Sequence, residues 1–300
     1  MKVNTRKIFR DLLSSDEIIV APGAYDAFTG RIIEQAGFKA IYVGGSNIHA
    51  IMGHADGEST MTEYLTHVKE IAEAVQTPLV VDMDTGFGTG SAIDLMRTVR
   101  ECERLGAAAV HTEDQVTAKR IFAYNGPELI PMEEMLKKIE AALDAREDKD
   151  LVFIARTDAR SRYGLEETLK RAKAYARAGA DMLAMPGLES VDELKRAVDY
   201  VGVPLMIFNG AMKPGDSGNK LTFLTALELQ KIGVKLVTFG NGVTRLVGKA
   251  VMDLMQEIKR TGTDNAFVDR MLTKGELQAL NGMPARDALR KKYQTDSPAS

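Results

Sequence analysis

The sequence predicts a (β/α)₈ TIM-type barrel, because a short apolar strand followed by a helical segment recurs eight times within 300 residues. Glycine elbows precede several of the strands, and polar residues collect directly after them. An open doubly wound sheet is the alternative. The glycine turn at 86–90 resembles a dinucleotide fingerprint, but it lacks the G-x-G-x-x-G spacing and follows an Asp-x-Asp.

Taken in order, an amphipathic helix at 4–15 precedes a first strand at 18–21, which ends at Pro22-Gly23. A helix at 24–37 closes on a glycine cap, and a strand at 38–43 follows it. The same rhythm predicts further strands at 79–83, 108–114, 151–158, 181–185, 203–209 and 235–240. Helices are expected at 61–75, 91–105, 132–146, 166–178, 190–200 and 222–231.

From about residue 262 the chain carries charged helices, expected at 270–280 and 285–292. Their apolar residues would form a face that packs on the barrel or on a neighbouring subunit: Val268, Met271, Leu272, Leu277 and Leu280. We therefore expect residues 1–300 to form one barrel domain with a C-terminal helical extension at about 262–300.

Composition excludes several classes of protein. The apolar fraction of 45% suits a full core, and the net charge of −3 with interspersed signs argues against a nucleic-acid partner. The single cysteine, Cys102, excludes an intrachain disulfide framework and suits a reducing cytoplasm. The N-terminus lacks the apolar core of a signal peptide, and no run is long enough to span a bilayer. We expect a soluble cytoplasmic protein.

Two acids end the strand at 79–83, Asp82 and Asp84. Strand geometry places residues i and i+2 on one face, so both carboxylates would point the same way. Like charges that close repel each other, and a divalent cation such as Mg²⁺ or Mn²⁺ would relieve the repulsion. The alternative is that Asp82 caps the turn while Asp84 is solvated, and the pair alone does not decide between them.

Polar residues also end or follow other strands, where a barrel builds its active site. Oxygen ligands would come from Asp56, Asp82, Asp84 and Glu113, and backbone N–H groups for an anion from the turn Gly44-Gly45-Ser46. Arg156 and Arg245 suit a carboxylate or phosphate, and Asn209 either contacts a ligand or holds a loop. The clustering favours a metal-plus-anion site over solvated caps.

Several separated motifs resemble the isocitrate lyase / phosphoenolpyruvate mutase superfamily, in an overall pattern most similar to its 2-methylisocitrate lyase branch. They are Val81-Asp-Met-Asp-Thr-Gly-Phe-Gly88, His111-Thr-Glu-Asp-Gln115, Ala118-Lys-Arg120 and Ile154-Ala-Arg-Thr-Asp-Ala159. The start Pro22-Gly-Ala-Tyr-Asp26 and the strand Ile41-Tyr-Val-Gly-Gly45 fit as well.

The resemblance implies a barrel with Mg²⁺ near the strand ends, in a homotetramer that exchanges its eighth helix between subunits. By position, Asp82 resembles the direct metal ligand, with Asp56, Asp84 and Glu113 contacting the metal largely through water. Gly44, Gly45 and Ser46 resemble the carboxylate-binding turn, and Arg156 the substrate-binding arginine. The family cleaves or forms a C–C or P–C bond beside an α-oxo or α-hydroxy carboxylate.

Two departures from the lyase pattern stand out. Lyases continue from the Glu-Asp motif into Lys-Lys/Arg-Cys-Gly-His, whose cysteine acts as an acid. Here Lys119-Arg120 lead into Ile-Phe-Ala-Tyr124, so that cysteine is absent. Lyases also place a glutamate where this chain has Met185-Pro186. The candidate catalytic residues are Arg156, Lys119, Arg120 and Tyr124, with Tyr124 the candidate replacement for the cysteine as proton donor.

We expect a Mg²⁺-dependent carbon–carbon lyase acting on a small 2-oxo or 2-hydroxy di- or tricarboxylate, oxaloacetate-like or 2-methylisocitrate-like, through a metal-stabilised enolate. Decarboxylation is the easiest chemistry, because departing CO₂ needs no proton, whereas a retro-aldol lyase also needs an acid and a base. One alternative is a phosphoenolpyruvate/phosphonopyruvate P–C mutase or hydrolase. Another is a ligand-binding homologue without turnover.

Overall fold

The chain divides into two compact units, Met1–Thr244 and Arg245–Ser300, in the computed structural model. The structure describes residues 3–117, 126–211, 221 and 223–294. The boundary lies before the expected start of the helical extension at about 262, because most of one long helix, α10, belongs to the second unit. That the chain forms one domain with a tail stays a prediction.

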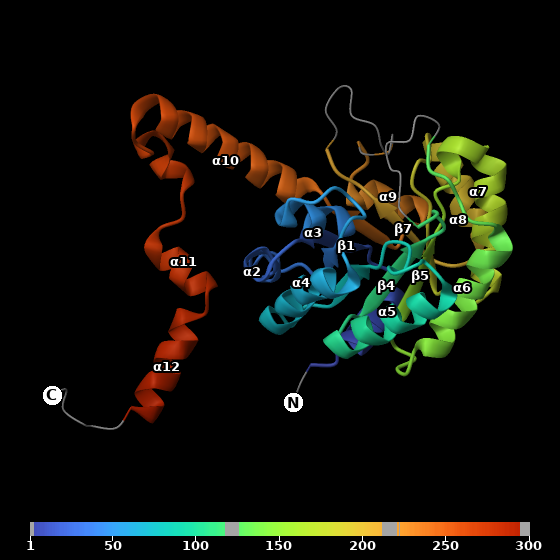
Figure 1. The fold of residues 1–300 in the computed structure, drawn as a ribbon, viewed down its shortest axis with the longest axis horizontal. Helices are drawn as coiled ribbons and strands as arrows, with labels where there is room; N and C mark the ends of the chain where they lie inside the picture. Colours follow the sequence, from blue (N-terminus) through green and yellow to red (C-terminus); the bar gives the residue numbers. More distant parts are fainter. Residues whose placement is uncertain (1–2, 118–125, 212–220, 222, 295–300) are drawn as a thin grey trace. The chain divides into compact units, whose positions relative to one another are not determined.

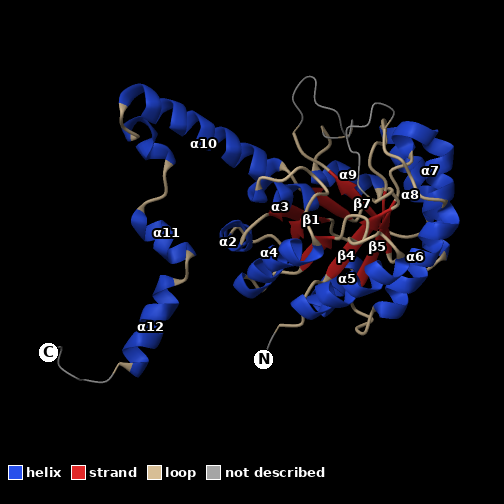
Figure 2. Ribbon diagram, viewed as in Figure 1, coloured by secondary structure: helices blue, strands red, loops and turns tan. Residues whose placement is uncertain are grey.

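The first unit is a closed barrel of eight parallel strands that pair in sequence order (Figures 1 and 2). The pairing of β1 with β8, which sets Ile19 beside Leu236, closes the ring. The strands are β1 (Ile19–Ala24), β2 (Ile41–Val43), β3 (Leu79–Asp82), β4 (Ala109–Glu113), β5 (Val152–Arg156), β6 (Met182–Ala184), β7 (Leu205–Phe208) and β8 (Leu236–Phe239). The predicted (β/α)₈ fold is therefore confirmed.

Helices surround these strands, as the blue ribbons around the red arrows of Figure 2 show. They are α1 (Thr5–Ser14), α2 (Ala27–Gln35), α3 (Gly45–Met52), α4 (Met61–Ala74), α5 (Ala92–Leu105), α6 (Met132–Ala145), α7 (Arg160–Arg177), α8 (Val191–Val201) and α9 (Ala226–Ile232). Most of these helices start at a capping side chain. At α4, for example, the Thr60 hydroxyl accepts a hydrogen bond from the Glu63 backbone N–H, and the Glu63 carboxylate accepts one from the Thr60 backbone N–H.

Strand residues alternate between two apolar layers. Tyr42 and Val80 face the barrel interior, where they join Phe9 of helix α1 in one buried cluster. Their strand neighbours Ile41 and Val81 face outward and pack in the layer beneath the helices. This two-sided burial gives the strands their near-continuous apolar sequences. It also determines which of the last residues of each strand face the barrel interior.

Helix α3 was not expected from the sequence, which predicts a turn and a long loop after β2. Gly44 instead caps the helix, and Gly45 and Ser46 form its first turn. The helix is short and carries a polar Ser-Asn-Ile-His stretch, so it lacks the apolar periodicity that reveals longer helices. Its position brings His49 beside the ends of β2 and β3.

The second unit consists of the remainder of α10 (Gly242–Thr261), a 3₁₀ turn η1 (Asn265–Arg270), α11 (Lys274–Leu280) and α12 (Met283–Tyr293). No residue of α10 is buried, although Val251, Met255 and Ile258 recur at helical spacing along it. Among the residues that the structure describes, no helix is both long and apolar enough to cross a membrane.

Candidate active site

The carboxyl ends of β2 to β5 bring several predicted residues into one buried region. Asp82 ends β3, Glu113 ends β4 and Arg156 ends β5, while Asp84 lies two residues beyond β3. The side chains of Asp82, Asp84 and Glu113 have little or no exposure to solvent. Burying three carboxylates together is costly, because each loses hydration and repels the others. Such a cluster is typical of a site that binds a cation or a cationic side chain.

Asp82 is fixed by three hydrogen bonds. Its Oδ1 accepts the backbone N–H of Asp84 at 2.9 Å, and its Oδ2 accepts the Tyr42 hydroxyl and the Gly45 N–H, both at 3.2 Å. The strand ends at Asp82, and Asp84 takes a left-handed backbone conformation with φ of 46°. The orientation of Asp84 is therefore set by this turn, and the strand alternation used in the sequence argument does not apply to it.

Gly45 is the point where the two aspartates meet α3. Its N–H donates to Asp82, and a Cβ at this position would lie 2.8 Å from Oδ1 of Asp84. No larger residue fits without displacing that carboxylate. The predicted glycine turn therefore has a second use, because it leaves room for both acids at the start of a helix, where the dipole favours negative charge.

Arg156 lies between two acids. Its Nη1 contacts Oε2 of Glu113 at 2.8 Å, and its Nη2 donates to Oδ1 of Asp158 at 2.9 Å. Burial alone would lower the pKa of Arg156, but Asp158 and Glu113 outweigh it and raise that pKa well above its usual value. Burial raises the pKa of Asp158 to about 6 despite the arginine. The Nε of Arg156 is buried and has no hydrogen-bond partner among the described residues, so one donor is available to a ligand.

Three aromatic side chains lie beside the acids, and the sequence argument did not assign them to the site. Tyr42 donates to Asp82, and its hydroxyl lies 3.0 Å from Nε2 of His111. The two rings stack with their centroids 5.7 Å apart, and Phe208 contacts both edge-on. Burial, and then Asp82, raise the pKa of Tyr42 well above its usual value, so this hydroxyl stays protonated as a donor.

His49 of α3 lies between Asp56 and Asp84. Its Nδ1 lies 2.9 Å from Oδ1 of Asp56, and its Nε2 lies 3.8 Å from Oδ2 of Asp84. Ser59 also contacts Nε2, at 2.6 Å. Asp56, the loop acid predicted from the sequence, therefore contacts the site by way of His49, which was not among the predicted site residues. The only signal was its place between two other candidates.

A further buried cation supports the turn after β3. The Nζ of Lys138, which is 1% exposed, donates to the carbonyl oxygen of Thr85 at 2.6 Å. Burial lowers the pKa of this lysine, while nearby acids such as Glu134 and Glu113 act in the opposite direction. Its place in the helical sequence of α6 resembles an ordinary surface lysine, so no sequence signal identified it.

The donor set suits a hard divalent cation. The acids at the strand ends are oxygen ligands, which Mg²⁺ and Mn²⁺ prefer. Among the described residues, no three acidic, histidine or cysteine side chains come close enough to enclose a metal ion directly. Mg²⁺ commonly keeps several waters and uses only one or two protein carboxylates, so this spacing fits a largely water-mediated site.

The family model for phosphoenolpyruvate phosphomutase matches residues 9–259, which is most of the chain. The chain belongs to the phosphoenolpyruvate mutase / isocitrate lyase superfamily. It is 36% identical to 2,3-dimethylmalate lyase of Eubacterium barkeri, over 98% of this chain and 99% of that protein. It is also 36% identical to 2-methylisocitrate lyase of Aeropyrum pernix, over 92% of this chain and 86% of that protein. The predicted resemblance is confirmed.

A solved structure with a similar fold is a complex with Mg²⁺. Phosphonopyruvate hydrolase in complex with oxalate and Mg²⁺ superposes with a TM-score of 0.85 at 29% identity, covering 98% of this chain and 100% of that chain. The chain is thus an enzyme of this superfamily, and the prediction of a carbon–carbon lyase agrees with the two lyases above.

The remaining predicted site residues have different surroundings, and some lie outside the described residues. Asn209 holds a loop, since its Nδ2 donates to the carbonyl of Leu224 and its Oδ1 accepts the N–H of Gly210. Ser46 donates to Asn241 at 2.9 Å. Arg245 is exposed and belongs to the second unit. Lys119, Arg120 and Tyr124 lie outside the described residues. Their roles as substrate or catalytic groups stay predictions.

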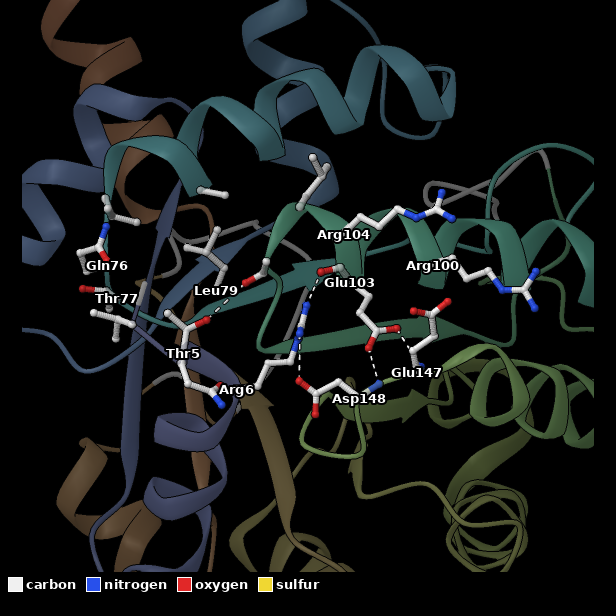
Figure 3. Close-up of a pocket in the computed structure, with 16 residues that line it drawn as sticks. Thr5, Arg6, Gln76, Thr77, Leu79, Arg100, Glu103, Arg104, Glu147 and Asp148 are labelled. Atoms are coloured by element: carbon white, nitrogen blue, oxygen red, sulfur yellow. Dashed lines mark hydrogen bonds and ion pairs between the residues drawn. The ribbon is translucent and has the colours of Figure 1, made fainter. Parts of the chain in front are cut away.

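A cavity of about 610 Å³ lies at the other end of the barrel, where β3 begins (Figure 3). Thr5, Arg6, Glu103 and Asp148 line it, and dashed lines in the figure connect them to one another and to the backbone. Active sites of (β/α)₈ barrels lie at the carboxyl ends of the strands, so this cavity is not the predicted site. None of the acids at the ends of β3 and β4 lines it.

Proposed function

We propose that this chain is a Mg²⁺-dependent lyase that cleaves a carbon–carbon bond in a small 2-oxo or 2-hydroxy di- or tricarboxylate. The observation that carries the proposal is the buried convergence of Asp82, Asp84 and Glu113 with Arg156 at the carboxyl end of the barrel. Acids for a cation and a guanidinium for an anion lie side by side there. An acidic small molecule chelating a metal satisfies both.

Arg156 is the proposed anchor for a substrate carboxylate. Glu113 and Asp158 hold its two terminal nitrogens, which fixes the plane of the guanidinium, while Nε has no partner among the described residues. Phe208 supports the guanidinium from one side, with Cζ 5.0 Å from the ring centroid. A preorganised arginine loses little entropy on binding and so orients the ligand strongly.

Asp82 is the proposed direct ligand of Mg²⁺, with Asp84, Glu113 and Asp56 contacting it largely through water. Support comes from the oxygen-rich donor set and from the Mg²⁺ complex of the related phosphonopyruvate hydrolase. When bound, the ion would act as a Lewis acid that favours negative charge on the oxygen beside the cleaved bond. Mn²⁺ has the same ligand preference and is the alternative ion.

The start of α3 is proposed to bind a second carboxylate of the substrate through Gly44, Gly45 and Ser46. Helix N-termini attract anions through unsatisfied N–H groups and the helix dipole. The Gly45 N–H already donates to Asp82, so the N–H groups of its neighbours Gly44 and Ser46 would serve the substrate. This arrangement would place the substrate between α3 and Arg156.

The reaction type depends on proton donors that the sequence places at 119–124. Decarboxylation of an oxaloacetate-like substrate needs charge stabilisation but no proton for the departing CO₂, whereas a retro-aldol cleavage needs an acid for the departing carbanion. Tyr124, Lys119 and Arg120 are the proposed catalytic residues of that segment. The lyase cysteine is absent there, which favours decarboxylation unless Tyr124 replaces it.

A substrate panel tests the proposal. Oxaloacetate, 2-methylisocitrate, 2,3-dimethylmalate and phosphonopyruvate would be assayed with Mg²⁺, with Mn²⁺ and with a chelator. We expect metal-dependent release of CO₂ or cleavage of one of the first three, and no activity in Asp82→Asn. Turnover that survives the chelator and the Asp82→Asn change would contradict the proposed metal role.

The second candidate is P–C bond chemistry, which the match to the phosphoenolpyruvate phosphomutase family favours. It would appear in the same panel as a ³¹P signal of phosphate or phosphoenolpyruvate formed from phosphonopyruvate. Tight, Mg²⁺-dependent binding of oxalate with no turnover of any substrate would instead favour a ligand-binding homologue.

We further propose a cytoplasmic homotetramer in which α10 is exchanged between subunits. Its apolar residues Val251, Met255 and Ile258 are exposed in the isolated chain, as a helix that packs on a partner would be. Light scattering coupled to gel filtration should give four times the mass of 32.8 kDa. Met255→Glu together with Ile258→Glu should shift the mass toward the monomer, and an unchanged mass would exclude this helix from the interface.

A further inference from the structure

Asp114, the residue after β4, is fully buried, and its side chain is contacted from two parts of the barrel. Its Oδ2 accepts the Tyr175 hydroxyl at 2.8 Å and Nη1 of Arg171 at 3.1 Å, both from helix α7. Its Oδ1 accepts the backbone N–H of Asp158 at 3.0 Å. A buried carboxylate needs such partners, and here they come from helix α7 and from the loop after β5, beside Arg156 of the candidate active site.

The same contacts hold two short stretches of chain together. Residues 114–116 and 128–130 pair in an antiparallel arrangement, with the Ile130 N–H donating to the Asp114 carbonyl and the Val116 N–H to the Glu128 carbonyl. Arg171 reinforces this pairing, because its Nη1 also donates to the Ile130 carbonyl at 3.0 Å. One nitrogen of Arg171 thus joins both stretches to α7.

A second path leads from Asp114 to Arg156. Asp158 contacts both residues. Its backbone N–H donates to Asp114, and its Oδ1 accepts a hydrogen bond from Nη2 of Arg156. The Oδ2 of Asp158 accepts the side-chain amide of Gln115 at 3.2 Å, so Gln115 joins the paired stretch to this carboxylate as well. A displacement of Asp114 would therefore move both the paired stretch and the guanidinium.

We propose that Asp114, Arg171 and Tyr175 form a positioning cluster, which fixes the paired stretches 114–116 and 128–130 and orients Arg156 through Asp158. This rests on the proposed function, because it assigns the cluster to the same site. Within the described part of the chain, Arg171 and Tyr175 make no hydrogen bond or ion pair with Asp82 or Asp84, so they act through other residues. A misplacement of about 1 Å in a substrate-positioning group can cost about 10²-fold in catalysis.

Arg171→Met tests the cluster, because it keeps the bulk of the side chain and removes its donors. We expect KM to rise by about 10-fold or more, since hydrogen bonds to charged groups are the strong ones. Arg171→Lys should restore much of the loss, because the contacts to Asp114 and Ile130 come from one nitrogen, which an ammonium can replace. Tyr175→Phe removes a single hydroxyl and should raise KM less.

Arg196→Met is the matched control. Arg196 of helix α8 forms an exposed ion pair with Glu166 of α7, with contacts of 2.6 and 2.9 Å. Among the described residues it contacts no member of the cluster. Its loss should leave KM unchanged. A cluster variant with a lowered melting temperature but wild-type KM would show a merely structural role and overturn the proposal.

Hydrogen exchange separates this proposal from the proposed function. The amides of Ile130, Val116 and Asp158 should exchange faster in Arg171→Met and Tyr175→Phe than in Arg196→Met, in the absence of any substrate. If the wild-type protein turns over nothing in the panel but these amides respond, the proposed function fails while the fixing of the paired stretch stands. Unchanged exchange in both cluster variants would overturn the cluster whatever the panel shows.

Discussion

The two ends of the barrel both carry buried charges, but the charges have different partners. At the amino end, Glu103 accepts the backbone N–H groups of Glu147 and Asp148, and Arg6 donates to the carbonyl of Ala107. These charges hold loops mainly through backbone groups, and Arg6 also forms an ion pair with Asp148 at 2.9 Å. At the carboxyl end, Asp82, Asp84 and Glu113 lie near one another and near one arginine.

The difference shows how to distinguish structural charges from those of a site. Charges satisfied by backbone groups contribute to folding and leave little capacity for a ligand. Carboxylates gathered together disfavour folding unless a cation joins them, so their presence indicates binding. The cavity in Figure 3 lies at the amino end, among charges that backbone groups satisfy, and its size alone does not make it a binding site.

The largest expected effect is the loss of activity in Asp82→Asn. The amide keeps the shape of the side chain but removes the charge that a metal requires, so kcat/KM should fall by at least about 10³-fold. Isothermal titration with Mn²⁺ in the presence of oxalate should show metal binding lost as well. Wild-type metal affinity would remove Asp82 from the proposed ligand set.

Arg156→Ala should raise KM by about 10²-fold or more, because removing one partner of a buried charge contact costs about 2–5 kcal/mol. Arg156→Lys should recover only part of the loss, since an ammonium cannot hold Glu113, Asp158 and a ligand in one plane. Steady-state kinetics on the accepted substrate would measure both. Unchanged KM in Arg156→Ala would contradict its role as the carboxylate anchor.

Glu103→Ala tests the amino end. It leaves two N–H groups without their acceptor, so we expect a loss of about 1–3 kcal/mol in the free energy of unfolding with kcat unchanged. Urea denaturation and kinetics on the same preparation would check this. A drop in kcat at unchanged stability would mean that the amino end takes part in function after all.

Lys138→Met should change metal binding at the carboxyl end, although Lys138 contacts the backbone of the turn after β3 rather than the substrate. The Thr85 carbonyl would lose its donor, the turn carrying Asp84 would become less well fixed, and we expect metal affinity to fall by about 10-fold. Lys137→Met, at an exposed position next along the same helix, is the control. Equal metal affinity in both variants would show that Lys138 supports only the fold.

The smallest effect concerns pH. The pKa of Asp158 is raised to about 6 by burial, whereas an ordinary aspartate has a pKa of about 3.9. The unfolded chain therefore releases this proton first as pH rises, so the group's contribution to stability is full below pH ~4 and is lost through pH ~6. As pH rises from 4 to 7, the melting temperature of Asp158→Asn should increase relative to that of the wild type. Parallel curves would contradict the raised pKa.

The sequence by itself determined the barrel, because each strand and helix carries a local apolar period and most helices carry capping residues. It also determined which acids follow which strands, and motif order indicated the superfamily before any coordinates. Asp82, Glu113 and Arg156 could be assigned in this way, since a barrel brings every strand end to one side.

Only the tertiary structure decided how those residues meet. Tyr42, His49, Lys138 and Arg171 come from separate elements, and no local pattern tells which buried polar group contacts which carboxylate. The orientation of Asp84 depends on a left-handed turn rather than on strand alternation, and α3 forms where the sequence suggested a loop. Contacts between distant residues depend on packing, whereas a period along the chain records only which side of an element is buried.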